Sequence, residues 1–134
     1  MPNLLETNIY NVKSKVLICG TCLPMMEPLG YQKLSKDYET ILYICLEKEH
    51  INMAITKICA ILSTKNVESI TFASVNKSPH CVQLHYMKNE IKRVMNNELI
   101  PPIRNIVIVD NKIHEIKDEA LVLSKDLIKL SNLK

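Results

Sequence analysis

Aromatic residues and glycine are scarce in this chain of 134 residues, which has one Phe, five Tyr, no Trp and only two Gly. With so few rings, the chain has little material for a surface that stacks nucleic-acid bases. Its net charge of +3 is mild, and its basic residues are spread along the chain without forming a basic arm. Gly20 and Gly30 fit neither the Gly-x-Gly-x-x-Gly pattern nor a phosphate loop. These absences argue against nucleic-acid binding and against a standard dinucleotide motif.

Long apolar runs are also missing from the sequence. No stretch approaches the roughly 18 apolar residues of a membrane span, and residues 1–7 lack the basic flank and apolar core of a secretion signal. We therefore expect a cytoplasmic protein with no membrane partner, in a compartment where thiols stay reduced. The five cysteines are then better interpreted as metal-binding, reactive or buried residues than as a disulfide framework.

Short β-branched runs alternate with longer helical stretches, a pattern typical of βαβ units around a mostly parallel sheet. Strands are predicted at 15–19, 40–45, 68–75 and 105–109, and helices from Pro28, over 51–64 and from Ser78-Pro79. The expected fold is a single three-layer α/β domain over residues 1–134, Rossmann-like or flavodoxin-like, with a mostly parallel sheet of four or five strands. Residues 1–14 fit neither pattern and could form an irregular N-terminal extension.

The C-terminal part of the sequence predicts a hairpin followed by a helix. Asp110-Asn111 favours a tight turn into a partner strand at 112–116, which would lie at the edge of the sheet. Asp118 is then predicted to cap a terminal helix. That helix would carry four apolar residues on or near one face: Leu121, Leu127, Ile128 and Leu130.

Four of the five cysteines follow the ends of predicted strands. Cys19 and Cys22 close the first strand, Cys45 closes the second, and Cys81 comes shortly after the third. Neighbouring parallel strands lie about 4.8 Å apart, and open α/β sheets place their ligand sites at the carboxyl edge, so these four thiols are expected to gather there. Cys19 and Cys22 also have the spacing that lets both sulfurs reach one metal, or each other. Cys59, in the middle of a predicted helix, is interpreted as a core residue.

Histidines accompany the last of these cysteines. Ser78, followed by proline, is a good N-cap, so His80 and Cys81 fall in the first helical turn, where the helix dipole favours a thiolate. Cys81 and His85 are four residues apart and share a helix face, a spacing compatible with joint metal ligation. His50 precedes another predicted helix and is a further candidate ligand. Each histidine could equally be a solvated, capping or satisfied core residue, and each cysteine could pack in the core.

The order of these segments resembles the delta subunit of methyl-viologen-reducing hydrogenases. That family is a small α/β iron–sulfur domain that passes electrons between a hydrogenase and heterodisulfide reductase. The matching pieces lie within about residues 15–95: Ile18-Cys19-Gly20-Thr21-Cys22, Tyr43-Ile44-Cys45 and Ser78-Pro79-His80-Cys81. The resemblance implies that its four cysteines hold a cluster. The chain departs from the family in having no further cysteine over 74–77 and little glycine.

Three functions stand as hypotheses. The first is a non-catalytic module that binds a 2Fe–2S or 4Fe–4S cluster, or zinc, through the four thiols and passes electrons to a larger oxidoreductase subunit. The second is a Rossmann-like domain that binds a phosphate-bearing small molecule at the helix N-terminus 78–81, with Ser78 among its contacts. The third is a cysteine-dependent redox enzyme with Cys81 as nucleophile and His80 or His85 as base. A second copy of the chain is an alternative partner to the oxidoreductase.

Overall fold

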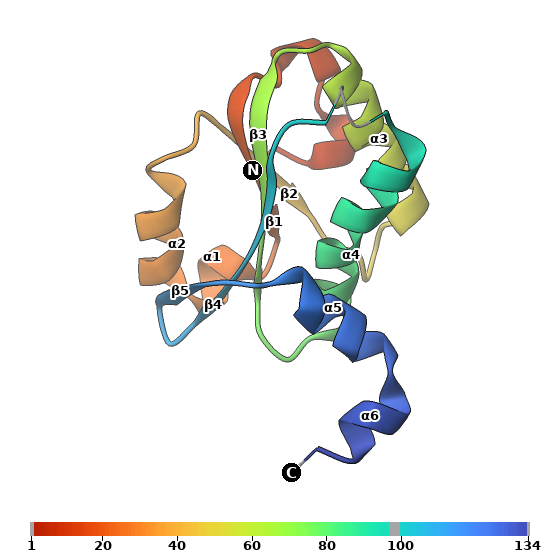
Figure 1. Ribbon diagram of the computed structural model, residues 1–134. Helices are drawn as coiled ribbons and strands as arrows, with labels where there is room; N and C mark the ends of the chain where they lie inside the picture. The colour runs from red at the N-terminus through yellow and green to blue at the C-terminus, as the bar shows by residue number, and fades with distance from the viewer. Residues whose placement is uncertain (1, 97–99, 134) are drawn as a thin grey trace.

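All four predicted parallel strands lie in one five-stranded sheet in the computed structural model, which describes residues 2–96 and 100–133. The strands are β1 (Ser14–Gly20), β2 (Thr40–Ile44), β3 (Val67–Val75), β4 (Ile103–Val109) and β5 (Lys112–Glu115). Their order in the sheet is β2-β1-β3-β4-β5 (Figure 1). The pairs β1–β2, β1–β3 and β3–β4 are parallel, whereas β5 pairs antiparallel with β4 at the edge. The predicted mostly parallel sheet with an edge hairpin is therefore confirmed.

Helices cover both faces of this sheet and give the molecule three layers (Figure 1). The helical elements are two 3₁₀ turns, η1 (Leu4–Glu6) and η2 (Ile9–Asn11), and the helices α1 (Leu23–Met26), α2 (Pro28–Ser35), α3 (Ile51–Ser63), α4 (Pro79–Val94), α5 (Asp118–Lys125) and α6 (Leu127–Ser131). The helices α1 and α2 lie on one face, and α3 and α4 lie on the other. Proline at the first position of α2 and α4 is favourable because the missing N–H would have no partner within the helix.

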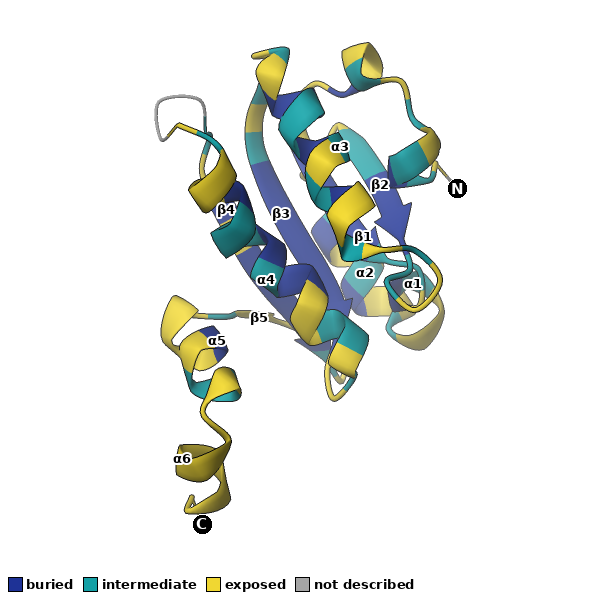
Figure 2. Cartoon of the chain, turned by 90° about the vertical axis from the view of Figure 1, so that its right-hand side faces the viewer, coloured by how far each residue is buried: buried dark blue, intermediate teal, exposed yellow. Residues whose placement is uncertain are grey.

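The pleat of the strands sorts the apolar side chains into two cores. On β1, Val16 and Ile18 pack in the core under α3 and α4, whereas Leu17 and Cys19 pack in the core under α1 and α2. This alternation follows from the two-residue period of a strand. Figure 2 shows the central strands buried between the helical layers, as expected for a parallel sheet covered on both faces.

The N-terminal segment is joined to the sheet rather than standing apart from it. Asn3 forms a parallel bridge with Tyr43, and the backbone N–H of Tyr43 donates to the carbonyl oxygen of Pro2 over 2.9 Å. Leu4 and Val12 are fully buried and pack with α3 in the larger core. The segment that could have formed an irregular extension thus contributes two core side chains.

The edge hairpin turns where the sequence predicted it, and its turn is hydrogen-bonded to residues at the start of α2. Asp110 and Asn111 both have positive φ angles, 52° and 59°, which is the backbone of a type I′ turn. The Glu27 carboxylate accepts from the backbone N–H groups of both turn residues, over 3.2 Å and 2.9 Å. In return, the Asn111 side chain accepts from the Gly30 N–H over 3.1 Å, a group in the first turn of α2 that no helical partner can satisfy.

The predicted terminal helix is instead two short helices that meet at Asp126. Asp118 is the first residue of α5 rather than its cap, and Lys117 occupies the N-cap position. Asp126 ends α5 and caps α6 by accepting from the backbone N–H of Lys129. The break separates Leu121, which is buried, from the exposed apolar residues of α6.

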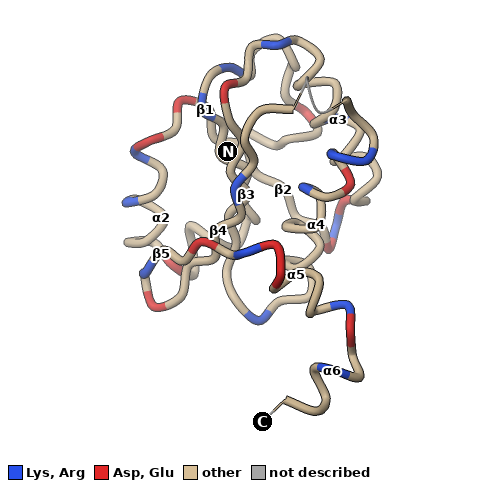
Figure 3. Tube along the Cα trace, viewed as in Figure 1, with Lys and Arg blue, Asp and Glu red and all other residues tan. Residues whose placement is uncertain are grey.

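Charged side chains are interspersed over the helices and loops, with both signs represented along the trace (Figure 3). This distribution agrees with the absence of a basic arm in the sequence. Over residues 2–96 and 100–133, no helix is long and apolar enough to cross a membrane.

Candidate binding site at the carboxyl edge of the sheet

The carboxyl ends of β1 and β3 lie side by side, but the chain leaves them toward opposite sides. From β1 it runs through α1 and α2 to β2, whereas from β3 it runs through α4 to β4. The connections also cover opposite faces of the sheet. Such a point, where the strand order reverses, is where open α/β sheets form a crevice for ligands.

A cavity of about 460 Å³ occupies this position. Three strand-end segments line it, residues 20–23, 44–47 and 75–78, together with the first turns of α4. The backbone N–H of Thr21 donates to the carbonyl oxygen of Ile44 over 3.2 Å, which ties the first two segments together. Most of the lining is apolar, including Leu23, Met26 and Leu84. Polar side chains therefore make up the smaller part of the cavity wall.

Three of the four predicted thiols reach the cavity and one does not. Cys22, Cys45 and Cys81 line it. Cys19 is fully buried in the core under α1 and α2, and burial raises the pKa of its thiol to about 12. Strand β1 therefore ends between Cys19 and Cys22. The first cysteine still points into the core of the sheet, while the second is exposed at the N-cap of α1.

The polar side chains of the cavity wall are those of Thr21, Glu47 and the segment from Asn76 to His80. The Nδ1 atom of His80 is buried and has no hydrogen-bond partner among the described residues. Lys77 has a positive φ of 67°, an uncommon backbone for a lysine that tends to occur at functional loops. Within the described part of the chain, the side chain of Ser78 makes no capping hydrogen bond to α4. The predicted cap position is correct, but its hydroxyl is not used to cap the helix.

A family model described as a Rossmann-like domain matches residues 11–133. The chain belongs to this family. No curated protein and no solved structure gives a significant match to it. The family thus confirms the fold expected from the sequence, and the crevice at the reversal of strand order is the usual place for a ligand in a Rossmann-like sheet.

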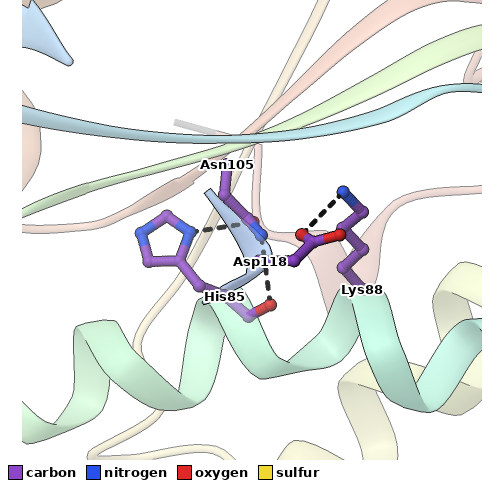
Figure 4. A network of polar contacts seen from close by, with 4 residues as sticks. All are labelled: His85, Lys88, Asn105 and Asp118. Atoms are coloured by element: carbon purple, nitrogen blue, oxygen red, sulfur yellow. Dashed lines mark hydrogen bonds and ion pairs between the residues drawn. The ribbon is translucent and has the colours of Figure 1, made fainter. Parts of the chain in front are cut away.

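His85 lies inside this Rossmann-like domain rather than at its cavity. Its Nε2 atom is 2.7 Å from the Ser74 hydroxyl, and its Nδ1 atom is 2.9 Å from Asn105 Oδ1 (Figure 4 shows the contact with Asn105). Because an amide oxygen can only accept, Nδ1 carries the proton and Nε2 accepts from Ser74. Burial lowers the pKa of His85, against a smaller raising effect of the bond to Asn105. Both ring nitrogens are thus engaged away from Cys81.

The sequence analysis did not predict the network of Ser74, His85 and Asn105, although the sequence contains a signal of it. Ser74 and Asn105 are buried polar residues on strands whose other buried residues are mostly apolar, and both lie on the sheet face covered by α4. A polar residue at an inward strand position needs a partner. Only the pairing of β3 with β4 beneath α4 shows that His85 is that partner.

The remaining candidates lie apart from the cavity. His50 is the N-cap residue of α3, and its side chain makes no capping bond among the residues described. Cys59 packs against the core under α3 and α4, as predicted, and burial raises its pKa. Over residues 2–96 and 100–133, no three His, Cys, Asp or Glu side chains are arranged to hold a metal ion.

The cavity wall nevertheless carries side chains of the types that can bind soft metals. Cys22, Cys45 and Cys81 offer sulfur, and His80 offers a buried nitrogen without a described partner. Thiolate and imidazole are the ligands that zinc and iron–sulfur clusters use in proteins. His80 therefore fits such a set better than Cys19, whose buried thiol resists ionisation.

Proposed function

We propose that this Rossmann-like chain is a binding domain for a small molecule that has an apolar body and a phosphate or carboxylate group. The observation that carries the proposal is the 460 Å³ cavity at the point where the strand order reverses. This volume falls within the roughly 300–1,000 Å³ of small-molecule sites, which are usually apolar with a few well-placed polar groups.

The anionic group of the ligand would bind at the N-terminus of α4. Pro79 has no N–H, and the Cys81 N–H donates to the Ser78 carbonyl oxygen over 3.1 Å. The backbone group that α4 offers to an anion is therefore the N–H of His80. The helix dipole favours a negative charge at the same place. The Ser78 hydroxyl and the Lys77 side chain belong to the same segment of the cavity wall. Because the loop after β1 is not glycine-rich, we place the anion at α4 rather than at α1.

The apolar body of the ligand would lie against Leu23, Met26 and Leu84. Gly20 also borders the cavity, and a Cβ atom built on it meets nothing within 4 Å. This position can therefore carry a larger side chain that projects into open space. It offers a way to block the cavity without disturbing the packing of the sheet.

A thermal-shift screen with nucleotides, sugar phosphates and acyl phosphates tests the proposal. A true ligand raises the unfolding midpoint in proportion to the logarithm of its concentration. Gly20→Leu should abolish the shift while the free protein keeps its fold. Lys77→Ala should weaken binding severalfold, because a charge-assisted bond is lost.

Lys65→Ala is the matched control for Lys77→Ala. Lys65 is also exposed and also has a positive φ, 62°, but it lies at the opposite end of the sheet, just before β3. It should bind like the unmodified chain. Equal shifts in the unmodified protein and Gly20→Leu would place binding elsewhere and contradict the proposal.

A second candidate function is metal or iron–sulfur binding at the same cavity, for electron transfer to a partner oxidoreductase. It is supported by the three thiols and the buried His80 nitrogen that line one space, and by the resemblance to hydrogenase delta subunits. Closure of the three lining segments would bring these donors together. The group itself would supply the redox chemistry, and the chain would hold it and exclude water.

Metal and sulfide analysis of anaerobically purified protein tests this alternative. Iron with sulfide, or zinc, should be present at a fixed ratio to the chain and fall in Cys22→Ser, Cys45→Ser and Cys81→Ser. Cys59→Ser is the matched control, because this residue packs on α3 away from the cavity. A metal-free protein in which the three cavity thiols all titrate freely would overturn the alternative.

A further inference from the structure

The C-terminal helix α6 carries an apolar surface that the rest of the chain does not cover. Leu127 is 74% exposed, Ile128 is 77% exposed and Leu133 is 57% exposed. Val122 on the neighbouring helix α5 is 65% exposed. Figures 1 and 2 show α6 extending away from the three-layer body. Apolar side chains gathered on one projecting segment usually mark an interaction surface.

The helix α5, which connects α6 to the rest of the chain, is attached to α4 by several contacts. The Tyr86 hydroxyl of α4 donates to the carbonyl oxygen of Leu121 over 2.6 Å, and the Lys125 ammonium lies 4.6 Å from the centre of the Tyr86 ring. Lys88 pairs with Asp118 at 3.0 Å (Figure 4). The helix α5 is therefore fixed to α4, whereas the main contacts of α6 are with α5.

A groove of about 450 Å³ lies beside the exposed apolar residues. It is lined by two apolar side chains, Val122 and Leu123, and by four charged ones, Asp118, Glu119, Asp126 and Lys129. Acidic residues dominate at the α5 end of the groove, while Lys129 stands at the α6 end (Figure 3 shows both signs on these helices). The segment formed by α5 and α6 thus has both a projecting apolar surface and a groove that could receive such a surface.

We propose that α5 and α6 form the interface of a two-fold symmetric dimer of this chain. In this dimer, α6 of each copy packs into the α5–α6 groove of its partner. A two-fold axis requires a self-complementary surface, and the projection and groove on one segment meet that requirement. Antiparallel pairing also brings Lys129 of one copy against Glu119 of the other. Asp118, Glu119 and Asp126 make the groove acidic overall, and the pairing of Lys129 with Glu119 offsets the repulsion between the carboxylates of the two copies.

The exposed apolar area is compatible with this partner. The five exposed apolar residues of α5, α6 and the residues just after α6 are Val122, Leu127, Ile128, Leu130 and Leu133. Together they present on the order of 500 Å² of apolar surface, against about 800 Å² in total per partner for a standard stable interface. The charged borders of the groove supply the polar rim that such interfaces need.

Sedimentation equilibrium of the full chain tests the proposal. The protein should sediment at twice the 15.4 kDa of one chain. Ile128→Asp should raise the dimer dissociation constant at least 100-fold, because a carboxylate would replace an apolar contact and face the acidic side chains of the groove. Val94→Asp is the matched control, since Val94 is 66% exposed at the end of α4 and lies outside the groove; it should remain dimeric. Circular dichroism verifies that both variants are folded.

A charge exchange tests the geometry of the pairing. Lys129→Glu alone and Glu119→Lys alone should each weaken the dimer about 10-fold, because like charges then face one another across the interface. The double variant should recover most of the loss. A monomeric unmodified chain at 100 μM, a dimer that persists in Ile128→Asp, or a double variant weaker than both single variants would overturn the proposal. A monomer that binds phosphatidylglycerol vesicles would also overturn it and assign α6 to a lipid surface.

Discussion

Individual residues of one chemical type have very different environments in this domain, and the cysteines show this best. Cys19 and Cys22 are separated by two residues, yet one is fully buried and the other is exposed. The reason is that β1 continues through Gly20, so Cys19 keeps the inward orientation of its strand position. Cys22 lies beyond the strand and is free to face the cavity.

Alkylation should separate these two thiols. At pH 8, a pKa of about 12 leaves roughly one Cys19 thiol in ten thousand ionised, and burial blocks access as well. We expect iodoacetamide to label Cys22 within minutes and Cys19 only after unfolding. Peptide mass spectrometry measures both rates in one sample. Equal labelling of the two cysteines in the folded protein would show that Cys19 reaches solvent.

Buried His85 should make the stability of the domain depend on pH. Burial lowers its pKa in the folded state, so the unfolded chain, with a histidine pKa of about 6.5, binds the proton more readily. The free energy of unfolding should therefore be highest above pH 6.5 and fall as the pH drops below that value. Urea unfolding at pH 7.5, 6.5 and 5.5 measures this trend.

The variant His85→Gln provides the control for that trend. Glutamine keeps a hydrogen-bonding side chain between Ser74 and Asn105 but cannot titrate. Its unfolding free energy should be lower at pH 7.5 and should change less between pH 7.5 and 5.5. The same pH dependence in both proteins would assign the effect to another group, since the chain has three more histidines.

Secondary-structure elements are coupled here by contacts between segments far apart in sequence. The hairpin turn at Asp110 and Asn111 is bonded to Glu27 and Gly30, more than 80 residues earlier. Asn111 satisfies an N–H of the first turn of α2, and Glu27 satisfies two N–H groups of the turn. Each element thereby supplies partners that the other lacks.

The two glycines of the chain should respond differently to alanine. A Cβ atom on Gly30 would lie 2.6 Å from the buried Ile108 side chain and 3.1 Å from Asn111 Cα. Although alanine favours a helix, this overlap should cost about 1–2 kcal/mol of unfolding free energy. Gly20→Ala is the matched control and should change the stability by less than about 0.5 kcal/mol, because its Cβ meets open space. Urea unfolding compares them, and equal losses would contradict the packing at Gly30.

At the scale of the whole molecule, the strand order decides where chemistry can take place. Connections from β1 and β3 diverge, so the space between their carboxyl ends stays open, and three loops with different side chains meet there. The exposed α6 projects from the side of α5 (Figure 1), and none of its described residues lines this space. The proposed ligand site and the proposed dimer interface use different parts of the chain, so each can be tested without the other.

Dimerisation through α6 should make the thermal stability of the domain depend on protein concentration. Mass action raises the unfolding midpoint of an associating protein as its concentration increases. We expect the midpoint to rise by several degrees between 1 and 100 μM, and to stay constant in Ile128→Asp. Differential scanning fluorimetry measures both series. A midpoint that does not change with concentration in the unmodified chain would contradict association of the folded protein.

Local patterns in the sequence were sufficient for the elements and their order. The β-branched runs, the Ser78-Pro79 start of α4 and the Asp110-Asn111 turn are all short-range signals, and each element appears close to its predicted bounds. The sequence also led to the carboxyl edge as the candidate site, because parallel strands separated by helices place all their ends together. The short helix α1 and the break at Asp126 were not foreseen, because each depends on only a few residues.

Tertiary structure alone decided which side chains share that edge. Whether Cys19 faces the core or the cavity depends on the residue at which β1 ends, and whether His85 is a ligand or a core residue depends on the pairing of β3 with β4. The burial of Leu121 and the exposure of Leu127 and Ile128 likewise depend on where α5 docks on α4. The sequence by itself determined a Rossmann-like sheet with thiols near its carboxyl edge. Packing selected Cys22, Cys45, Cys81 and His80 as the residues at the cavity, because side-chain direction is set by long-range contacts that no local pattern contains.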